Sequence, residues 1–250
     1  MIRYDVYSPQ LGHSIVVEVS LPPGYRHLRG PFPAAILNDA QNQWTNRGAY
    51  GGWHTDSTAA YLFRKGRIRP VILIGVYSPR GRDRVYAPPP DGKADRYADF
   101  LADTLLPSAR GRFPVSRNPA DVAVMGASYG SNVAILAGLY RPDAIGLVAG
   151  LSGAPHFGKP LTEILSERQR LPMRKLYIDC GTRWAYDQPR MDDSTAFNRN
   201  VMSLAYSRMP RGRFQGHVAR GHFHNEEFWR RRVGRILQFL FGSSSQRRGG

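Results

Sequence analysis

Asp121-Val-Ala-Val-Met-Gly126-Ala-Ser128-Tyr-Gly130 joins an unbroken apolar run to a Gly-x-Ser-x-Gly motif, and a short apolar helical pattern follows at Ser131–Tyr140. An apolar run without alternation is typical of a strand buried on both faces. Strand, glycine-bounded serine and helix in this order form a nucleophile elbow, a tight turn that presents the serine hydroxyl at the carboxyl edge of a sheet. This stretch therefore predicts buried parallel strands and identifies Ser128 as a candidate nucleophile.

The rest of the chain repeats this alternation of strand and helix. Helical patterns cover Tyr97–Ala109 and the amphipathic Glu226–Phe241, and apolar runs on either side of residues 9–13 predict an opening antiparallel hairpin. Such alternation predicts an α/β fold with a mostly parallel central sheet and helices on both faces. The expected strands, besides the one before Ser128, include Ser14–Leu21, Ala34–Leu37, Pro70–Val76, Gly146–Leu151, Lys175–Ile178 and Gly212–Ala219.

Length and composition favour one domain. A chain of 250 residues is long enough to bury a single large core, so we expect one domain over residues 1–242 and a polar, disordered tail over residues 243–250. The single cysteine, Cys180, excludes an intramolecular disulfide framework and lacks the partners of a structural zinc site. We expect neither a metal nor an organic cofactor.

The formal net charge is +16, and a basic surface attracts polyanions whatever their sequence. However, the 31 arginines and four lysines are spread along the chain and coincide with no nucleic-acid-binding module, so we expect no specific nucleic-acid partner. Residues 1–12 lack the apolar run of a signal peptide, and no segment reaches the roughly 18 apolar residues of a membrane span. The sequence predicts a soluble, cytoplasmic protein and indicates no particular oligomeric state.

A general base is expected downstream of the candidate nucleophile. His222 and His224 both lie in the loop between the last expected strand and the last helix, where an imidazole can reach back to Ser128. His156 comes too early in the chain, and His217 falls inside an expected strand. His222 and His224 are therefore the two candidates.

Several further segments carry a resemblance to a known family, and the most telling is His224-Asn-Glu-Glu-Phe-Trp229. The others, besides the elbow, are Leu21–Tyr25, Asn38–Asn42, Gly52–Trp53, Gly75–Val76 and Arg82–Pro88. Over nearly its whole length the chain resembles the putative esterase family, which includes siderophore, feruloyl and acetylxylan esterases, esterase D and mycolyl-transfer enzymes.

The resemblance implies an α/β-hydrolase fold and a serine esterase. It implies that His224 is the general base, because the family's catalytic histidine precedes a tryptophan by five residues, and that Trp229 packs its helix behind the site. His222 has the wrong spacing to Trp229, and we interpret it as a residue of the substrate-pocket wall.

The third member of the triad is expected to be a carboxylate after the seventh strand, where it would fix the tautomer of the imidazole. The chain departs from the family here, since many relatives have Gly-Thr-x-Glu and this chain reads Gly181-Thr-Arg-Trp184. Asp187 is the first carboxylate beyond this point and is our candidate, with Asp192 and Asp193 as alternatives. Asp179 is interpreted as a structural partner at the strand end.

Two backbone N–H groups are expected to stabilise the oxyanion: that of Tyr129, directly after the nucleophile, and, by resemblance, that of Gln41. Relatives have Asp-Gly-Gln-Asn where this chain has Ala40, which would be strained if the turn requires a positive φ. Aromatic side chains in loops on the same edge of the sheet are expected to line the substrate pocket, among them Trp44, Trp53 and Trp184, together with Tyr50 and Tyr129.

These residues predict a serine carboxylic-ester hydrolase that acts on a small-molecule ester through an acyl-enzyme and a Ser-His-Asp triad. Two alternatives remain open. One is an acyltransferase at the same site, in which an acceptor alcohol replaces water. The other is a catalytically inactive basic binding protein of the same fold, which the missing Gly-Thr-x-Glu carboxylate keeps open.

Overall fold

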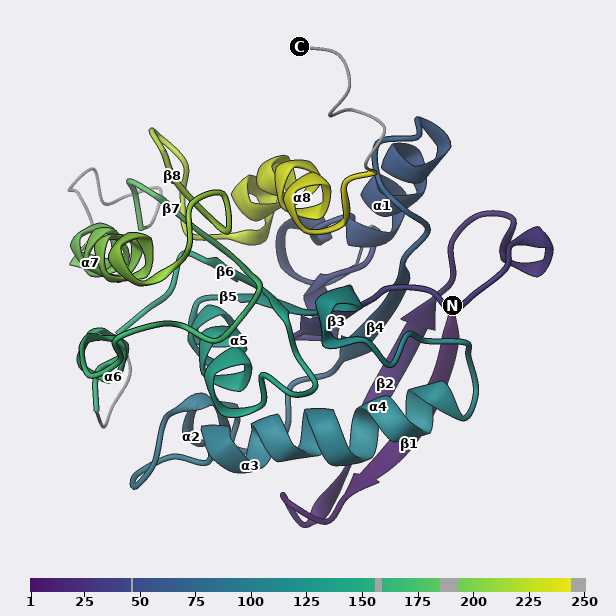
Figure 1. Ribbon diagram of the computed structural model, residues 1–250, viewed down its shortest axis with the longest axis horizontal. Coiled ribbons are helices and arrows are strands. Elements are labelled where there is room, and N and C mark those ends of the chain that lie inside the picture. Colours follow the sequence, from purple (N-terminus) through teal and green to yellow (C-terminus); the bar gives the residue numbers. More distant parts are fainter. Residues whose placement is uncertain (46, 156–158, 185–192, 244–250) are drawn as a thin grey trace.

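A single eight-stranded sheet runs through the computed structural model, which describes residues 1–45, 47–155, 159–184 and 193–243 (Figure 1). The strand order is β1-β2-β4-β3-β5-β6-β7-β8. β1 pairs antiparallel with β2, and β2 pairs antiparallel with β4, whereas the strands from β4 to β8 in this order are parallel. The predicted mostly parallel sheet and its opening hairpin are thus confirmed.

The strands follow the apolar runs to within a few residues. β3, β4, β5 and β6 are buried along their whole length, as expected for strands covered on both faces. Their bounds are Ile2–Ser8 for β1, His13–Ser20 for β2, Ala34–Asn38 for β3, Ile72–Val76 for β4, Val122–Ala127 for β5, Leu147–Leu151 for β6, Lys175–Gly181 for β7 and Phe214–Ala219 for β8.

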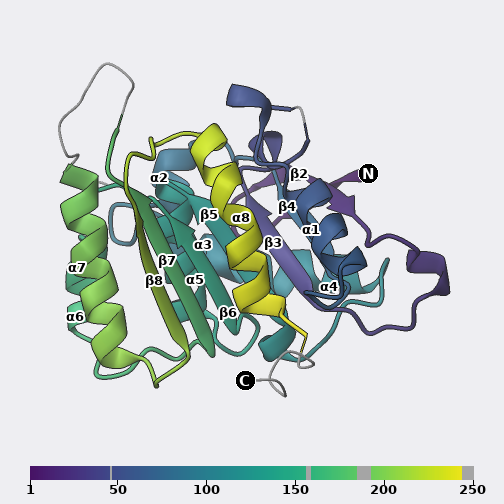
Figure 2. The same ribbon diagram turned by 90° about the horizontal axis from the view of Figure 1, so that it is seen from above.

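Helices cover both faces of the sheet (Figure 2). α1 (Thr55–Arg64) and α8 (Glu226–Phe241) pack on one face, where the amphipathic α8 buries Val233, Ile236 and Leu237. The other face is covered by a larger group of helices that share one apolar core with it: α2 (Arg82–Tyr86), α3 (Ala94–Asp99), α4 (Leu106–Arg110), α5 (Tyr129–Tyr140), α6 (Leu161–Ser166) and α7 (Asp193–Arg208).

The helices differ from the sequence prediction in extent and number. The helix expected at Tyr97–Ala109 begins at Ala94 and ends at Arg110, with a π-helical stretch at Phe100–Leu105 between α3 and α4. α5 begins at Tyr129, two residues earlier than expected, because the elbow leads directly into it. α1, α2, α6 and α7 were not predicted. α2 and α6 are only 5 and 6 residues long, and the apolar residues of α7 do not gather on one face. α1 buries only Thr55, Ala59 and Leu62.

The C-terminal end is described as far as Ser243, and the rest of the expected tail, residues 244–250, lies outside the described residues. Ser243 itself is held, because its hydroxyl donates to the Gly66 carbonyl at 2.5 Å and its N–H donates to the Arg67 carbonyl at 3.3 Å. Within the described ranges, no helix is long and apolar enough to cross a membrane.

Candidate active site

Ser128 occupies the sharp turn between β5 and α5, with φ 57° and ψ −129°. Its N–H donates to the Leu151 carbonyl at 3.0 Å, which ties the turn to the neighbouring strand β6. A Cβ atom at Gly126 would lie 2.5 Å from the Gly130 carbonyl oxygen, and one at Gly130 would lie 2.8 Å from Oδ2 of Asp39. Both glycines are therefore needed for the close approach of strand, helix and neighbouring loop.

A cavity of about 120 Å³ opens beside the turn. It lies at the carboxyl ends of β3 and β5, where ligand sites of parallel sheets are usually found. The loop after β3, α2, the elbow and the first turns of α8 contribute its lining, which consists of Asp39, Gln41, Asn42, Gln43, Trp53, Arg82, Ala127, Ser128, Glu226 and Trp229.

In the turn that directly follows β3, the positive φ falls on Asp39 and not on Ala40. Asp39 has φ 57° and ψ 53°, and a turn of 3-10 helix begins with Ala40. The strain that a glycine-to-alanine replacement could bring is thus absent at Ala40. Its methyl group packs closely on Gly75, where an added Cβ would lie only 2.8 Å away. Asp39 tolerates the left-handed conformation better than most residues do.

Asp39 is fixed by four donated hydrogen bonds. Arg82 binds it in a bidentate manner, from Nε to Oδ1 and from Nη2 to Oδ2, each at 2.7 Å. The hydroxyls of Ser78 and Tyr86 donate to Oδ1 at 2.6 and 3.3 Å. Burial alone would lower the pKa of Arg82, but its hydrogen bonds with Asp39 raise that pKa above the ordinary value, so the guanidinium stays charged.

The same loop places the backbone of Gln41 at the cavity. The Gln41 side chain is held by Ser78, since its Nε2 donates to the Ser78 hydroxyl at 2.7 Å and its Oε1 accepts from the Ser78 N–H at 3.3 Å. Its backbone N–H makes no hydrogen bond to another described residue. Tyr129 begins α5 beside Ser128, and the Arg82 guanidinium lies 5.9 Å from the centre of its ring.

His224 is half-buried between two indoles. Its ring centre lies 3.9 Å from that of Trp184 and 5.1 Å from that of Trp229, which meets it edge-on. Burial and, to a lesser extent, the cation of Arg232 lower the pKa of His224 to about 3. The imidazole is therefore neutral at neutral pH, the state that a general base requires. Among the described residues, neither Ser128 nor a carboxylate is hydrogen-bonded to it.

Most of the candidate triad acids lie outside the described residues. Asp187 and Asp192 lie in the undescribed range 185–192, and Asp193 is the first residue of α7, with its side chain outside the described part. Asp179 is fully buried and forms an ion pair with Arg232, whose Nε lies 3.0 Å from Oδ2. Asp179 thus has the structural role that was expected of it.

Arg232 also contacts His222, the second candidate base. Its Nη1 lies 3.1 Å from Nδ1 of His222, and because a guanidinium can only donate, Nδ1 is the acceptor. Its Nη2 donates to the Ser152 hydroxyl at 3.2 Å, which also accepts from Nε1 of Trp229 at 3.1 Å. His222 is therefore engaged by Arg232, and neither His222 nor His224 is among the residues that line the Ser128 cavity.

The aromatic residues expected in the pocket separate into three groups. Trp53 lines the cavity and packs on Trp229, with ring centres 5.4 Å apart. Trp44 is buried in the core, where its ring lies over Gly75, so the expectation that it lines the pocket was wrong. Trp184 is 40% exposed and covers His224, and Tyr50 is exposed to solvent.

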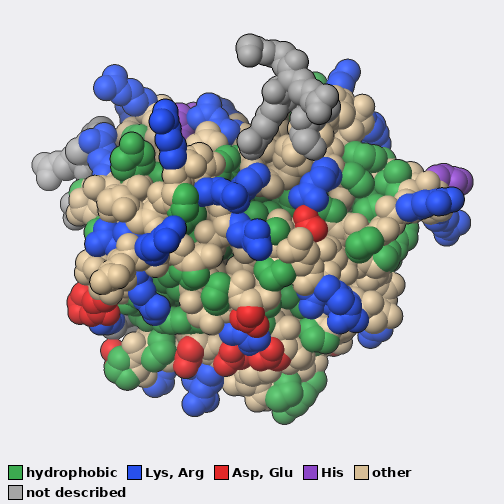
Figure 3. Space-filling view, in the orientation of Figure 1, with side chains coloured by type: hydrophobic (Ala, Val, Ile, Leu, Met, Phe, Trp, Pro, Cys, Tyr) green, Lys and Arg blue, Asp and Glu red, His purple; other side chains and the backbone are tan. Residues whose placement is uncertain are grey.

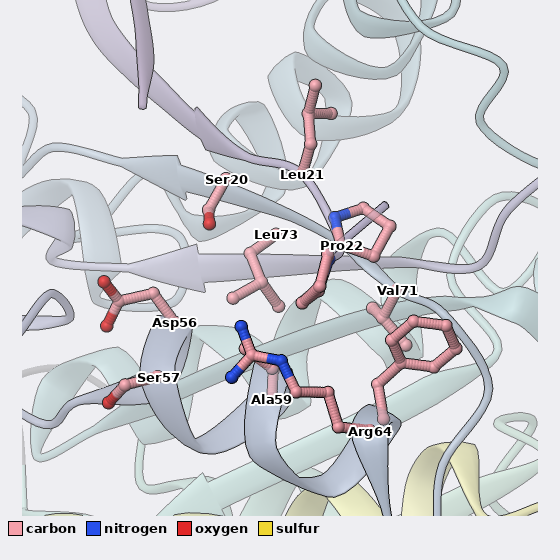
Figure 4. Close-up of a pocket in the computed structure, with 12 residues that line it drawn as sticks. Ser20, Leu21, Pro22, Asp56, Ser57, Ala59, Arg64, Val71 and Leu73 are labelled. Atoms are coloured by element: carbon pink, nitrogen blue, oxygen red, sulfur yellow. The ribbon is translucent and has the colours of Figure 1, made fainter. Parts of the chain in front are cut away.

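A second cavity, of about 290 Å³, lies between the end of β2 and α1 (Figure 4). Its apolar floor includes Val71 and Leu73, and Asp56, Ser57 and Arg64 lie at its side. Its two serines, Ser20 and Ser57, lack the strained positive φ that Ser128 has at the turn between β5 and α5. The Ser128 cavity is therefore the better candidate for nucleophilic chemistry. No group of three metal-ligating side chains is found in the described part of the chain.

Three charged residues of the cavity were missed in the sequence: Asp39, Arg82 and Glu226. All three stand in segments that carry the family resemblance, so the signal that could have identified them was charge within those segments. Elsewhere, lysine and arginine side chains are scattered over the surface instead of forming one patch on the face in Figure 3.

Comparisons with known proteins are consistent with this geometry. A family model described as "Putative esterase" matches residues 8–240. "Uncharacterized protein YbbA" of Bacillus subtilis (strain 168) is 26% identical over 145 residues, which are 54% of this chain and 54% of that protein. The chain thus spans about half the length of this curated relative.

Solved structures share the fold at low sequence identity. An IroE-like serine hydrolase from Shewanella oneidensis has a TM-score of 0.75 and 19% identity, covering 96% of this chain and 79% of its own. The enterobactin esterase FES from Shigella flexneri has a TM-score of 0.73 and 19% identity, covering 96% and 58%. Siderophore hydrolase EstB from Aspergillus nidulans has a TM-score of 0.71 and 20% identity, covering 96% and 93%. The fold is the α/β-hydrolase fold.

Proposed function

This chain belongs to the putative esterase family, and we propose that it hydrolyses carboxylic esters through an acyl-enzyme on Ser128. The observation that carries the proposal is the backbone of Ser128. Its φ of 57° and ψ of −129°, between a buried strand and a helix, place a serine beside a cavity at the carboxyl edge of the sheet. Such strain is typical of functional sites.

In the proposed reaction, the Ser128 hydroxyl attacks the ester carbonyl while His224 accepts its proton, and His224 then protonates the leaving alcohol. Water repeats the two steps and releases the acid. The depressed pKa keeps the imidazole of His224 in the neutral form that can accept a proton, but a pKa of about 3 also makes it a weaker base than an ordinary histidine. Hydrogen-bond lengths between nucleophile and base are often long before substrate binds.

The backbone N–H groups of Gln41 and Tyr129 are proposed to stabilise the oxyanion, and loss of one such donor typically costs about 3 to 4 kcal/mol of barrier. The Asp39–Arg82 pair and Ser78 hold the loop that carries Gln41 in place. Asp187 is proposed as the acid that orients His224. The reaction requires no metal or organic cofactor.

The proposed partner is a small-molecule ester, and the lysine and arginine side chains scattered over the face in Figure 3 favour no specific nucleic-acid partner. Structural neighbours are described as acting on enterobactin, siderophores or ferulic acid. The Ser128 cavity measures about 120 Å³, well below the 300 to 1,000 Å³ or so of sites for drug-sized ligands. We therefore propose that the group bound in this cavity is small.

The proposal is tested by hydrolysis of p-nitrophenyl acetate at neutral pH. Ser128→Ala and His224→Ala should each lose roughly three orders of magnitude or more of turnover. His217→Ala, a histidine in β8, is the matched control for removal of an imidazole. Loss in His222→Ala with retention in His224→Ala would move the general base to His222.

Two further outcomes separate the alternatives. Accumulation of a new ester when an acceptor alcohol is added would identify an acyltransferase at the same site. Absence of turnover in the wild type, with no covalent labelling of Ser128, would leave a binding protein of this fold and refute the hydrolase proposal.

A further inference from the structure

Glu226 places a buried carboxylate in the same cavity as Ser128. It is the first residue of α8, only 7% of its surface is exposed, and it lines the cavity together with Ser128 and Trp229. Its Oε1 accepts a hydrogen bond from Nδ2 of Asn42 at 3.0 Å. That bond holds the carboxylate from one side, while Glu226 itself lines the cavity.

The other charges of the cavity compensate one another. Asp39 and Arg82 form a bidentate pair with both contacts at 2.7 Å. Glu226, by contrast, forms no ion pair with any lysine, arginine or histidine among the described residues, and its neighbour of known contact, Asn42, is uncharged. A protein with a formal charge of +16 therefore has an unbalanced negative charge beside its candidate nucleophile.

An ionised carboxylate that is buried without a cation is unfavourable. Burial raises the pKa of Glu226, and the nearby charge of Asp39 raises it further, against the lowering effect of its own backbone N–H. The positive end of the α8 dipole compensates only a fraction of one charge. A cationic group that entered the cavity would supply the missing partner, and it would donate a charge-assisted hydrogen bond.

We propose that Glu226 forms a subsite for an ammonium group, so that the preferred substrates are small esters that carry a primary amine near the scissile carbonyl. This inference rests on the esterase activity proposed above, and it assigns a substrate class to that site. The ammonium group would donate to the Glu226 carboxylate, which Asn42 holds through Oε1. Because Ser128 and Glu226 line the same cavity of about 120 Å³, we expect the ammonium group and the scissile carbonyl to be only a few bonds apart.

The test compares two esters of the same shape, the methyl esters of β-alanine and of butanoic acid, in which a methyl group replaces the ammonium group. We expect the wild type to favour the β-alanine ester by about tenfold or more in kcat/KM, the range of a hydrogen bond to a charged group. Glu226→Gln should bring this ratio to about one. Glu227→Gln is the matched control, because Glu227 pairs with Arg231 at 2.6 Å, and this variant should keep the wild-type ratio.

A wild-type ratio of one or less, or a ratio that survives in Glu226→Gln, would overturn the subsite. The wild-type ratio of kcat/KM values for the two esters is measured without any variant, so it tests the subsite even if Glu226→Gln does not fold.

Binding separates this inference from the proposed activity. In Ser128→Ala, calorimetry measures the affinity for both esters without turnover, and the subsite predicts tighter binding of the β-alanine ester. Turnover of the butanoate ester without a preference would refute the subsite alone. Absence of turnover in the wild type, with the binding preference present, would refute the esterase proposal alone.

Discussion

Replacing Arg232 by methionine should strongly destabilise the protein. Arg232 is 4% exposed, and its guanidinium lies 3.0 Å from the fully buried Asp179 and donates to Ser152 at 3.2 Å. In Arg232→Met, Asp179 keeps the hydroxyl of Tyr177, 3.1 Å away, but loses its cation. Removal of one partner from a buried ion pair costs about 3 to 5 kcal/mol, because the other charge stays buried and unpaired.

For a chain of this length, 1 kcal/mol corresponds to roughly 2 to 4 °C in Tm, so we expect Arg232→Met to lower Tm by about 6 to 20 °C. The double variant Asp179→Leu/Arg232→Met should recover most of this loss, since replacing both charges by apolar groups is often neutral. The geometry supports recovery. Nε of Arg232 is close to Asp179 but not aligned for a hydrogen bond, and Oδ1 of Asp179 has no partner among the described residues.

The assay is thermal and urea unfolding of wild type, both single variants and the double variant, analysed as a double-mutant cycle. Burial raises the pKa of Asp179, and loss of the Arg232 cation should raise it further. The folded state of Arg232→Met then binds more protons than the unfolded state, so its stability falls as pH rises above about 4, the carboxyl pKa of the unfolded chain. Additive losses in the cycle, or a Tm change below about 2 °C, would refute this reasoning.

Three further predictions concern the site. Burial and Arg232 lower the pKa of His224 to about 3, so the imidazole stays neutral when the solution is acidified. The acid limb of the pH profile of kcat/KM should therefore lie well below the ordinary histidine pKa of 6.5. An acid limb near 6.5 would contradict the assignment of His224 as the base. Gly130→Ala would place a Cβ atom 2.8 Å from Oδ2 of Asp39. The rate of p-nitrophenyl acetate hydrolysis should fall at least about tenfold, and urea unfolding should show a free energy of unfolding lower by about 1 to 3 kcal/mol. Wild-type values in both assays would refute the close approach of Gly130 to Asp39. Arg82→Lys cannot make the bidentate contact with Asp39, so kcat should fall about tenfold with little change in KM, and an effect confined to KM would place Arg82 in substrate binding instead.

The sequence predicted the parts of the fold that depend on local pattern. The elbow around Ser128 and the whole of α8 could be predicted because an unbroken apolar run indicates a buried strand and a helical period of apolar residues indicates an amphipathic helix. α7 was missed because its apolar residues are spread around the helix instead of forming one stripe, and its helical form depends on packing against the rest of the molecule.

The charge pattern of the site could not be predicted in this way. Asp39, Arg82 and Glu226 are far apart in the chain, and only the folded sheet edge brings them around one cavity. The same holds for the tryptophans, since Trp44 and Trp53 both stand in the connection between β3 and α1 but only Trp53 reaches the cavity. The strain expected at Ala40 depended on which residue of the turn takes the positive φ, and that residue is Asp39.

Covalent labelling of the nucleophile tests the central claim most directly. Wild type and Ser128→Ala are incubated with a fluorophosphonate at neutral pH, and intact mass and peptide mapping then locate the adduct. A single phosphonyl group per chain on Ser128, absent from Ser128→Ala, is the result expected of a serine activated in this elbow. No adduct on the wild type, or an adduct on another serine, would contradict the assignment of Ser128 as nucleophile.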